Sequence, residues 1–359
     1  MPTISIEQKL LKQLLARHGL EHDIEKMAHE LPLLGTDIDL CDEQTLDIEI
    51  FPDRPDLLSG ETLAKAIRPF LHGTKSKPEL DVETGSIQMT VDPELEHIRP
   101  VILGAIVRDV ETGNTSQEKD DFIKSLMDHQ EKLHFALGRG RRRASIGVHD
   151  LSKISPPFRV KAVPSTTSFC PLASTEEMTL KEILESHPKG VDYAHLLKDM
   201  SEYPIIFDSN NEVLSFPPII NGNHTTVSHT TCDFFIDVTG WDRRACESSL
   251  MLIALQLAER GGRIESVEVT GYDGKVEHLP QSSPLEHKVT ERLLDGLLGR
   301  SLNDEEISNA INRMGGEYLG REQASLTTSA TVTKMSDVVE GDMVLTFAMP
   351  RWRFDILHP

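Results

Sequence analysis

The first part of the chain carries apolar residues at both helical and strand-like spacing. Leucines and isoleucines recur at three- and four-residue steps before Gly19, which is typical of an amphipathic helix. Apolar and polar residues alternate over 46–51, as they do in a strand with one buried face. The pattern predicts a small α/β module over residues 1–78 that ends in a polar linker. Its predicted elements are a helix from Ile6 to Gly19, helices over 22–31 and 57–71, and a strand over 46–51.

The middle of the chain predicts strands rich in Val, Ile and Phe with helices between them. A long helix over 242–260 is apolar on most of its faces, so we expect it to be buried. This mixture predicts an α+β domain over 86–281. The predicted strands are 87–91, 101–107, 145–148, 158–163, 204–207, 212–216, 233–240 and 264–271, and further helices are predicted over 120–137, 180–184 and 191–197.

The last part of the chain predicts a third, helix-and-strand unit over 282–359. Glycines follow both of its predicted helices, as they often do at helix ends. The chain as a whole is therefore expected to be a multidomain α+β protein. The predicted helices are 285–298 and 304–314, and the strand candidates are 317–320, 325–336 and 343–350.

Composition narrows the class of protein. The 359 residues carry a net charge of −21, which argues against a protein that binds nucleic acid over its whole surface. A local basic patch is still compatible with this charge. The four cysteines are far apart and form no CxxC pair, so we expect neither a zinc knuckle nor a disulfide framework, and a reducing, cytoplasmic setting. No apolar run is long enough to span a membrane and the start lacks a signal-peptide pattern, so we expect no membrane partner.

General catalytic signatures such as the P-loop, GxGxxG, GxSxG and HExxH are absent from the sequence. His149 and Asp150 together suggest a base and its orienting carboxylate. Adjacent residues of a strand point to opposite faces, however, so a structural role is favoured for this pair.

The segment 214–226 is the densest polar and backbone-restricted stretch. Pro217 and Pro218 cannot continue a central ladder, so a strand here must leave the sheet or form its edge. Asn221-Gly222 predicts a tight turn with a positive φ. Amide, imidazole and hydroxyl groups then follow, which suits a wall for a small polar ligand. A hairpin whose side chains only satisfy local backbone groups is the alternative.

A dense basic cluster lies at 138–143, with the sequence GRGRRR. Guanidinium groups match phosphate oxygens, so Arg139, Arg141, Arg142 and Arg143 are candidates for contacts with a nucleic-acid backbone. A solvated loop that balances nearby acids is the competing interpretation.

Several motifs, in order along the chain, resemble the archaeal/eukaryotic-type phenylalanyl-tRNA synthetase β-subunit family. They are DIEIFPDRPDLLS (47–59), GRGRRRASIGVHD (138–150), LSFPPIING (214–222), DVTG (237–240) and RFDILH (353–358). The resemblance implies an N-terminal β-subunit module over 1–78, a B3/B4 tRNA-editing domain over 86–281 and a B5 domain over 282–359.

The resemblance also implies a division of labour. In the family the α subunit activates phenylalanine with ATP and charges tRNA(Phe), within a tetramer of two α and two β subunits. The B3/B4 domain hydrolyses tyrosine wrongly attached to that tRNA. A second site is useful because a hydrophobic pocket rejects an added hydroxyl only about a hundredfold.

Site residues are carried over from the matching motifs. Within LSFPPIING, the resemblance implies that Leu214, Pro217 and Ile219 shape the editing pocket and that Ser215 and Asn221 act on the ester. His224, Thr225 and Thr226 are nearby polar candidates. We expect a positioned water to cleave the ester without a covalent serine intermediate.

Asp355 matches a family position associated with Mg²⁺. The companion acids of the family lie beyond Pro359, and a lone carboxylate does not meet the octahedral preference of this ion, so we expect no metal here. The family's C-terminal catalytic-like module also lies beyond that residue, so editing is expected of this chain but tetramer assembly and aminoacylation are not. The alternatives are a non-catalytic scaffold that binds tRNA or the α subunit, and a free-standing amino-acid-binding protein.

Overall fold

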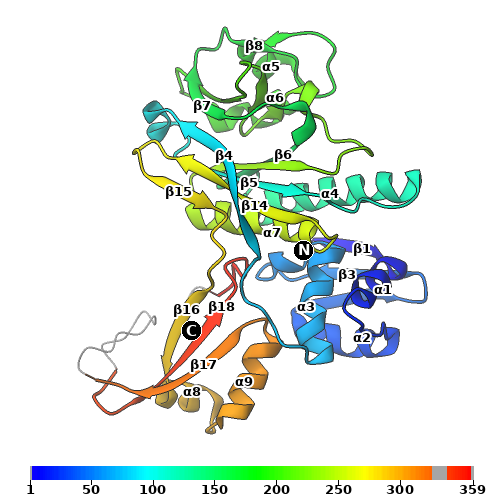
Figure 1. Ribbon diagram of the computed structural model, residues 1–359, viewed down its shortest axis with the longest axis vertical. Coiled ribbons are helices and arrows are strands. Elements are labelled where there is room, and N and C mark those ends of the chain that lie inside the picture. Colours follow the sequence, from blue (N-terminus) through cyan, green and yellow to red (C-terminus); the bar gives the residue numbers. More distant parts are fainter. Residues whose placement is uncertain (1, 326–337, 357–359) are drawn as a thin grey trace. The chain divides into compact units, whose positions relative to one another are not determined.

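The computed structural model describes residues 2–325 and 338–356 and has an α+β architecture (Figure 1). It contains two compact units. Unit 1 joins Met1–Leu80 to Ser282–Pro359, and unit 2 is Asp81–Gln281. Unit 1 thus brings together the two segments that the sequence analysis treats as separate modules. Among the described residues, no helix is long and apolar enough to cross a membrane.

The N-terminal half of unit 1 is a three-stranded antiparallel sheet with helices against it. The helix predicted from Ile6 is wrong at its start, because residues 3–7 pair with the next strand and bury Ile4 and Ile6 on one face. Two isoleucines at alternating positions, Ile4 and Ile6, are too short a pattern to predict a strand. The elements are β1 (Thr3–Glu7), α1 (Gln8–Ala16), α2 (Ile24–Glu30), β2 (Thr36–Cys41), β3 (Thr45–Ile50) and α3 (Gly60–His72).

The C-terminal half of unit 1 is a second three-stranded sheet, in the order β16-β18-β17, with two helices. The helix predicted over 285–298 is wrong in its first half, where residues 285–290 pair with the last strand. The strand candidate 325–336 lies, apart from Ser325, outside the described residues. The elements are β16 (Leu285–Thr290), α8 (Glu291–Leu298), α9 (Asp304–Arg313), β17 (Glu317–Gln323) and β18 (Met343–Met349).

A buried ion network ties the two halves of unit 1 together. Arg54 binds Asp56 with two parallel bonds of 2.9 Å, and Arg353 binds Asp355 in the same way at 2.9 and 2.7 Å. Nε of Arg353 lies 4.0 Å from Oδ2 of Asp56. Burial alone would raise the pKa of Asp56, but Arg54 and then Arg353 hold it below its usual value. The motifs PDRPD and RFD therefore meet in one buried cluster.

Unit 2 is built on a ten-stranded sheet in the order β12-β11-β10-β7-β4-β14-β5-β13-β6, with β15 paired to β14. The pairs of β4 with β14 and with β7 are parallel, and the other pairs are antiparallel. The strands are β4 (Val82–Val91), β5 (Val101–Arg108), β6 (Ala144–Asp150), β7 (Phe158–Val163), β10 (Tyr203–Phe207), β11 (Val213–Phe216), β12 (Ile220–Asn221), β13 (Phe234–Gly240), β14 (Arg263–Thr270) and β15 (Val276–Leu279), with the short pair β8 (Ser168–Phe169) and β9 (Met178–Thr179) beside them.

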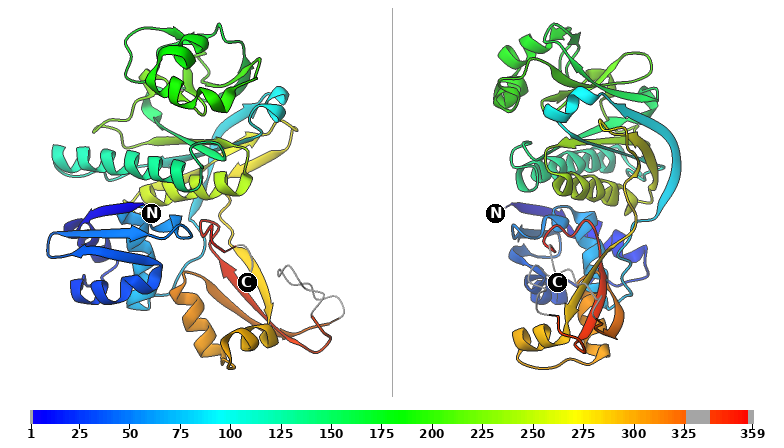
Figure 2. Two further views of the ribbon diagram at one scale, coloured as in Figure 1. Left: turned by 180° about the vertical axis from the view of Figure 1, so that it is seen from behind. Right: turned by 90° about the vertical axis from the view of Figure 1, so that its left-hand side faces the viewer.

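Helices α4 (Ser116–Ala136) and α7 (Arg243–Ala258) lie side by side against β5, β6 and β13 (Figures 1 and 2). The predicted burial of α7 is confirmed, since 12 of its residues are buried. Phe234 of β13 meets Phe122 of α4 edge-on, so the even-numbered residues of β13 face the helices. The odd-numbered residues Phe235, Asp237 and Thr239 therefore face away from them. Two short helices, α5 (Leu180–Ser186) and α6 (Pro188–Tyr193), cover the far end of the sheet near β10–β12.

The ion network of unit 1 predicts a large penalty for removing one partner. Arg54→Met leaves the Asp56 carboxylate buried beside Arg353 alone, and we expect a loss of about 3–5 kcal/mol in the free energy of unfolding. The double variant Arg54→Met/Asp56→Leu should recover much of that loss, because no unpaired charge is then buried. Urea unfolding followed by the fluorescence of Trp352, which is buried in unit 1, checks this in a Trp241→Phe background. Equal losses in the single and double variants would contradict it.

Candidate functional site

The predicted pocket wall lies at the free edge of the large sheet. Strand β11 ends at Phe216, the two prolines make the turn, and β12 returns antiparallel with Ser215 opposite Asn221. The positive φ predicted for Gly222 is wrong, since its φ is −70°. Glycine is needed there for another reason: a Cβ would lie 2.2 Å from the carbonyl oxygen of Val213. A close approach of two backbones, and not a left-handed turn, accounts for this glycine.

The apolar members of the wall are interior residues. Leu214, Pro217 and Ile219 are all buried, and Ile219 packs in the core that α5 and β10–β12 share. Polar contacts begin with Ser215, whose hydroxyl donates to Oδ1 of Asn221 at 3.3 Å. Asn221 is half-buried, which makes it the accessible polar member of this segment.

Asn221 connects the wall to strand β6, the edge strand at the opposite end of the sheet order. Its Nδ2 donates to the carbonyl oxygen of Val148 at 3.5 Å. The carbonyl of Ile146, two residues earlier, accepts from Gln130 at 2.7 Å, and the N–H of Ile146 donates to His134 at 2.8 Å. Side chains thus form the hydrogen bonds that another strand would otherwise form with the backbone groups on the outer edge of β6.

A fully buried histidine forms the centre of the site. The Nε2 of His149 lies 2.7 Å from Oδ2 of Asp237, and its Nδ1 lies 2.8 Å from the hydroxyl of Thr225. That hydroxyl also lies 3.0 Å from the carbonyl oxygen of Gly222. The hydroxyl has one proton, so it donates to only one of these two groups at a time. The ring of His149 thus lies between Thr225 and Asp237 and contacts both.

The carboxylate of Asp237 lies between two glycines. Gly104 of β5 and Gly147 of β6 are its direct neighbours across the sheet, and a Cβ on Gly147 would lie 2.0 Å from Oδ2. Within the described part of the chain, Oδ1 of Asp237 accepts no hydrogen bond. The sheet thus holds a buried carboxylate with one oxygen still able to accept.

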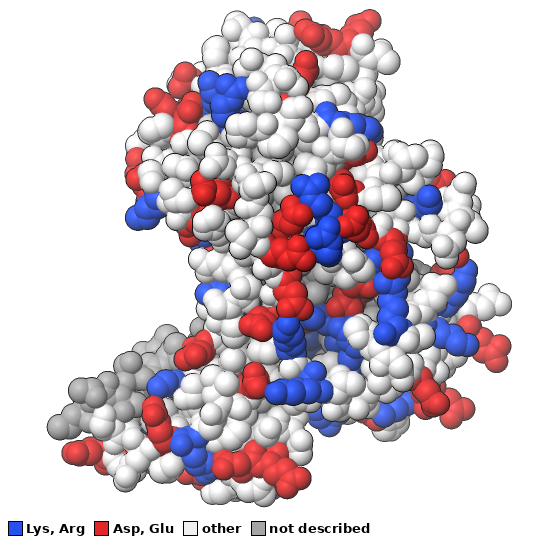
Figure 3. All heavy atoms as spheres, viewed as in Figure 1, with Lys and Arg blue, Asp and Glu red and all other residues white. Residues whose placement is uncertain are grey.

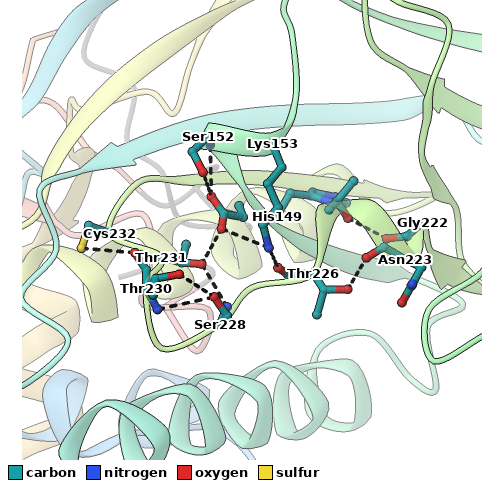
Figure 4. Close-up of polar contacts among 12 residues, drawn as sticks. His149, Ser152, Lys153, Gly222, Asn223, Thr226, Ser228, Thr230, Thr231 and Cys232 are labelled. Atoms are coloured by element: carbon teal, nitrogen blue, oxygen red, sulfur yellow. Dashed lines mark hydrogen bonds and ion pairs between the residues drawn. The ribbon is translucent and has the colours of Figure 1, made fainter. Parts of the chain in front are cut away.

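Asp150 belongs to a different network from His149, as the alternation of the strand predicts. It accepts from the hydroxyls of Ser152 at 2.6 Å and Thr231 at 2.7 Å and holds the loop after the site (Figure 4). Lys153 joins the same loop by donating to the carbonyl oxygen of Thr226 at 2.6 Å. The Thr226 hydroxyl donates to Asn223, so it serves the local backbone.

His224 is exposed and stands apart from the His149 pair. Burial of part of its ring lowers its pKa, so the imidazole is neutral near neutral pH. Of the five predicted polar candidates, Ser215 and Asn221 bind each other, Thr225 binds His149, and Thr226 binds the local backbone.

A buried arginine extends the network along β13. Arg99 donates to the hydroxyl of Thr239 at 2.7 Å, to the carbonyl oxygen of Thr239 at 2.8 Å and to that of Arg141 at 3.0 Å. Burial lowers the pKa of Arg99 to about 10, which still leaves it charged at neutral pH. The nearby carboxylate of Asp237 opposes this lowering, because it attracts the charged guanidinium.

The arginines of the basic cluster differ sharply in exposure. Arg141 is buried with a φ of +67°, and it donates to the carbonyl oxygen of Ile219 at 2.9 Å and to Glu131 at 2.7 Å. Its guanidinium also lies over the ring of Tyr193, 4.3 Å from the centroid. Arg141 therefore supports the predicted pocket wall from inside. Arg139 and Arg142 are exposed, and Arg143 is half-buried.

The described residues do not fit a magnesium site. Both oxygens of Asp355 are taken by the guanidinium of Arg353. Within the described ranges, no group of three His, Cys, Asp or Glu side chains is arranged to hold a metal ion. Asp355 belongs to the ion network of unit 1.

A surface pocket of about 530 Å³ lies at residues 173–186. Glu176, Glu177 and Glu182 line it, and the N–H of Ala173 donates to Asn223 at 3.3 Å. Three carboxylates repel phosphate groups, so this pocket does not suit a nucleic-acid backbone.

Sequence reasoning missed His149 as a partner of Asp237, as well as Thr239 and Arg99. His149 and Asp237 are 88 residues apart and meet only through the pairing of β6 with β13. The available signal was an acidic residue within the apolar strand DFFIDVTG, because an unpaired charge is rarely buried.

The contacts of Glu131 predict a pH dependence of stability. The His134 imidazole, with Nδ1 at 3.6 Å, and the Arg141 guanidinium hold the pKa of Glu131 down to about 2. A lowered carboxyl pKa stabilises the folded state above about pH 4.5, and this contribution disappears as the pH falls toward 2. Because Glu131 is half exposed, we expect Glu131→Gln to cost no more than about 1 kcal/mol at pH 7. Urea unfolding of both proteins at pH 7 and pH 3 should show that gap closing; a gap unchanged at pH 3 would contradict the assignment.

Comparison with known proteins identifies the family. The B3/4 domain family matches residues 99–269, which lie inside unit 2. The chain is 40% identical to the phenylalanine–tRNA ligase beta subunit of Methanococcoides burtonii over 100% of this chain and 61% of that protein, and 42% identical to that of Methanosarcina acetivorans over 92% and 59%. It thus spans about three fifths of the length of these relatives. The crystal structure of an N-terminal fragment of the phenylalanyl-tRNA synthetase beta-subunit from Pyrococcus horikoshii matches 99% of this chain and 96% of that fragment, with a TM-score of 0.83 and 32% identity. The chain therefore belongs to the family of phenylalanine–tRNA ligase β subunits, of which it corresponds to the N-terminal portion.

Proposed function

We propose that unit 2 of this chain hydrolyses tyrosine from mischarged tRNA(Phe). The observation that carries the proposal is the meeting of two features that are far apart in sequence. Asn221, from the predicted pocket wall, reaches the backbone of Val148, and the next residue of that strand is His149, which is bound to Asp237 and Thr225. An amide donor and an oriented imidazole are thus positioned on one strand edge.

The roles follow from the chemistry of ester hydrolysis. Water oxygen bonds to the carbonyl carbon, the bond from that carbon to the ribose oxygen breaks, and a proton passes from the water to the departing ribose oxygen. The accessible amide of Asn221 is suited to stabilise the negative charge that develops on the carbonyl oxygen. His149 holds the transferred proton through the Thr225 hydroxyl, and Asp237 orients the ring.

Recognition of tyrosine requires an acceptor for its hydroxyl. Oδ1 of Asp237 has that capacity, and the residues directly opposite Asp237 on both neighbouring strands are glycines. Phenylalanine would leave this buried carboxylate oxygen without a partner, which is the stronger form of discrimination. An editing site that prefers tyrosine would thus remove the tyrosine that a hydrophobic aminoacylation site fails to reject.

In the complete enzyme, we propose that this chain's family partner, the α subunit, performs the ATP-dependent charging of tRNA(Phe). The exposed Arg139 and Arg142 are proposed to contact the tRNA backbone, while Arg141 serves the wall. On the face in Figure 3, acidic and basic side chains are mixed, so a small local contact fits better than a broad basic field.

A non-catalytic scaffold is the second candidate, and the closure of the network favours it. Asp237, His149 and Thr225 are 1%, 0% and 0% exposed and bind one another. A buried set of polar groups that bind one another is also typical of a structural network in a sheet. A chain of this kind binds tRNA without releasing tyrosine.

Hydrolysis assays separate the two candidates. We expect the purified chain to release tyrosine from Tyr-tRNA(Phe) faster than phenylalanine from Phe-tRNA(Phe). Asn221→Ala should lower the rate constant for tyrosine release by roughly 10²–10³, the usual loss for one oxyanion donor. Asp150→Asn is the matched control, since it removes a buried carboxylate next to His149 that faces the other network. A wild-type chain that releases neither amino acid supports the scaffold.

Substitution of Asp237 tests recognition separately. Asp237→Asn keeps the shape but removes the charge, and we expect the preference for tyrosine over phenylalanine to fall at least about tenfold, because charge-assisted hydrogen bonds are roughly twice as strong as neutral ones. The ratio of kcat/KM for the two esters is the measurement. An unchanged ratio with a lower rate for both esters would assign Asp237 to the orientation of His149 alone.

A further inference from the structure

The basic cluster leaves two cations available to a ligand. The guanidinium of Arg141 is bound by Glu131, and Nε of Arg143 lies 3.6 Å from Asp242. Arg139 and Arg142 are exposed and form no ion pair with any described residue. Two available cations in a chain of net charge −21 are too few for tight binding by charge alone.

Two exposed aromatic rings flank the same loop. Phe135, in the last turn of α4 just before the cluster, is 74% exposed, and Trp241, directly after β13, is 49% exposed. Among the large apolar side chains that the described residues expose, these two are the most exposed aromatic rings. Aromatic residues are 5% of the chain, so their position on both sides of one basic loop is a specific feature of the surface.

Backbone hydrogen bonds join the loop to Trp241 and to the turn of α4 that carries Phe135. The N–H of Trp241 donates to the carbonyl oxygen of Arg143 at 3.0 Å. On the other side, Gly140 donates to His134 at 2.9 Å, so the loop folds back onto the turn of α4 that carries Phe135. A Cβ on Gly240 would lie 2.0 Å from the Arg143 carbonyl oxygen, which shows how closely the end of β13 approaches the loop.

Exposed rings beside unpaired guanidinium groups recognise unpaired nucleotides. Bases stack on the rings, which is independent of salt, and phosphates contact the arginines. A base-paired helix keeps its bases stacked inside and offers little to such rings. We infer that Phe135 and Trp241, together with Arg139 and Arg142, form a stacking surface for single-stranded RNA, namely the unpaired end of the tRNA.

The position of this surface suits the proposed site. Trp241 follows Asp237 by four residues along β13, which is about 14 Å in an extended strand. An RNA end that rests on Trp241 is therefore about 14 Å from Asp237, measured along the chain. This inference rests on the proposed function, because it takes tRNA as the partner.

RNA binding tests the inference without any ester. The full chain is titrated with a short single-stranded RNA and with its blunt duplex, and the fluorescence of Trp241 and the anisotropy of labelled RNA are followed. Phe135→Ala and Trp241→Ala should each weaken binding of the single strand about 5- to 150-fold, whereas Trp241→Phe, which keeps a ring, should stay close to wild type. Leu297→Ala is the matched control, since it removes a 77% exposed apolar side chain in unit 1.

The salt dependence separates the rings from the arginines. With two cations, the slope of log K against log salt should be about −1.4 for a single strand, and the ring variants should keep it. Arg139→Gln/Arg142→Gln should bring the slope close to zero. Ring variants that bind the single strand as wild type does, or that weaken the duplex equally, would overturn the inference, as would rings whose loss weakens only binding of the α subunit.

The two proposals fail in different ways. A chain whose rings carry RNA binding but which releases no tyrosine upholds the stacking surface and overturns the proposed hydrolysis. A chain that hydrolyses Tyr-tRNA(Phe) with the same KM in wild type and both ring variants overturns the stacking surface and upholds the hydrolysis.

Discussion

Unit 2 depends on the buried charge of Arg141. One guanidinium neutralises Glu131 on α4, donates to the backbone of the proline turn and lies over Tyr193 of α6. Its own carbonyl oxygen accepts from Arg99, which is bound to Thr239. A left-handed φ at a non-glycine residue such as Arg141 is costly, and these contacts hold Arg141 in that conformation. The polar network and the pocket wall share this support, so neither is set independently of the other.

The edge strand β6 shows how the same groups stabilise the sheet and build the site. A free strand edge exposes donors and acceptors that attract other strands. Here His134, Gln130 and Asn221 occupy them, and Asn221 comes from the opposite end of the sheet order. The amide that closes the edge is also the accessible polar group of the pocket wall. Protection of the edge and placement of the candidate chemistry are thus one arrangement.

The family and the α+β fold could be predicted from the sequence, because ordered motifs and long apolar patterns are local. The burial of α7 is an example, since the apolar residues on most of its faces all belong to one continuous segment of the sequence. β1 and β16 were mistaken for helix because strand pairing, which is non-local, overrides a short helical rhythm. The pair of His149 with Asp237 depends on the register of two strands, and the burial of Arg141 depends on three elements. Neither the pair nor the burial of Arg141 can be predicted from the number or the spacing of residues in the sequence. The site residues named from the motifs stay predictions.

The order of the units along the chain has a consequence for synthesis. Unit 1 is made of the first 80 residues and of those from 282 onward, with all of unit 2 between them. At about 5–20 residues per second, a ribosome needs roughly 10–40 s to make the intervening segment. Asp56 has Arg54 from the start but meets Arg353 only after that interval. The nascent N-terminal half therefore lacks its C-terminal partner segment during that interval, while the inserted unit has time to fold first.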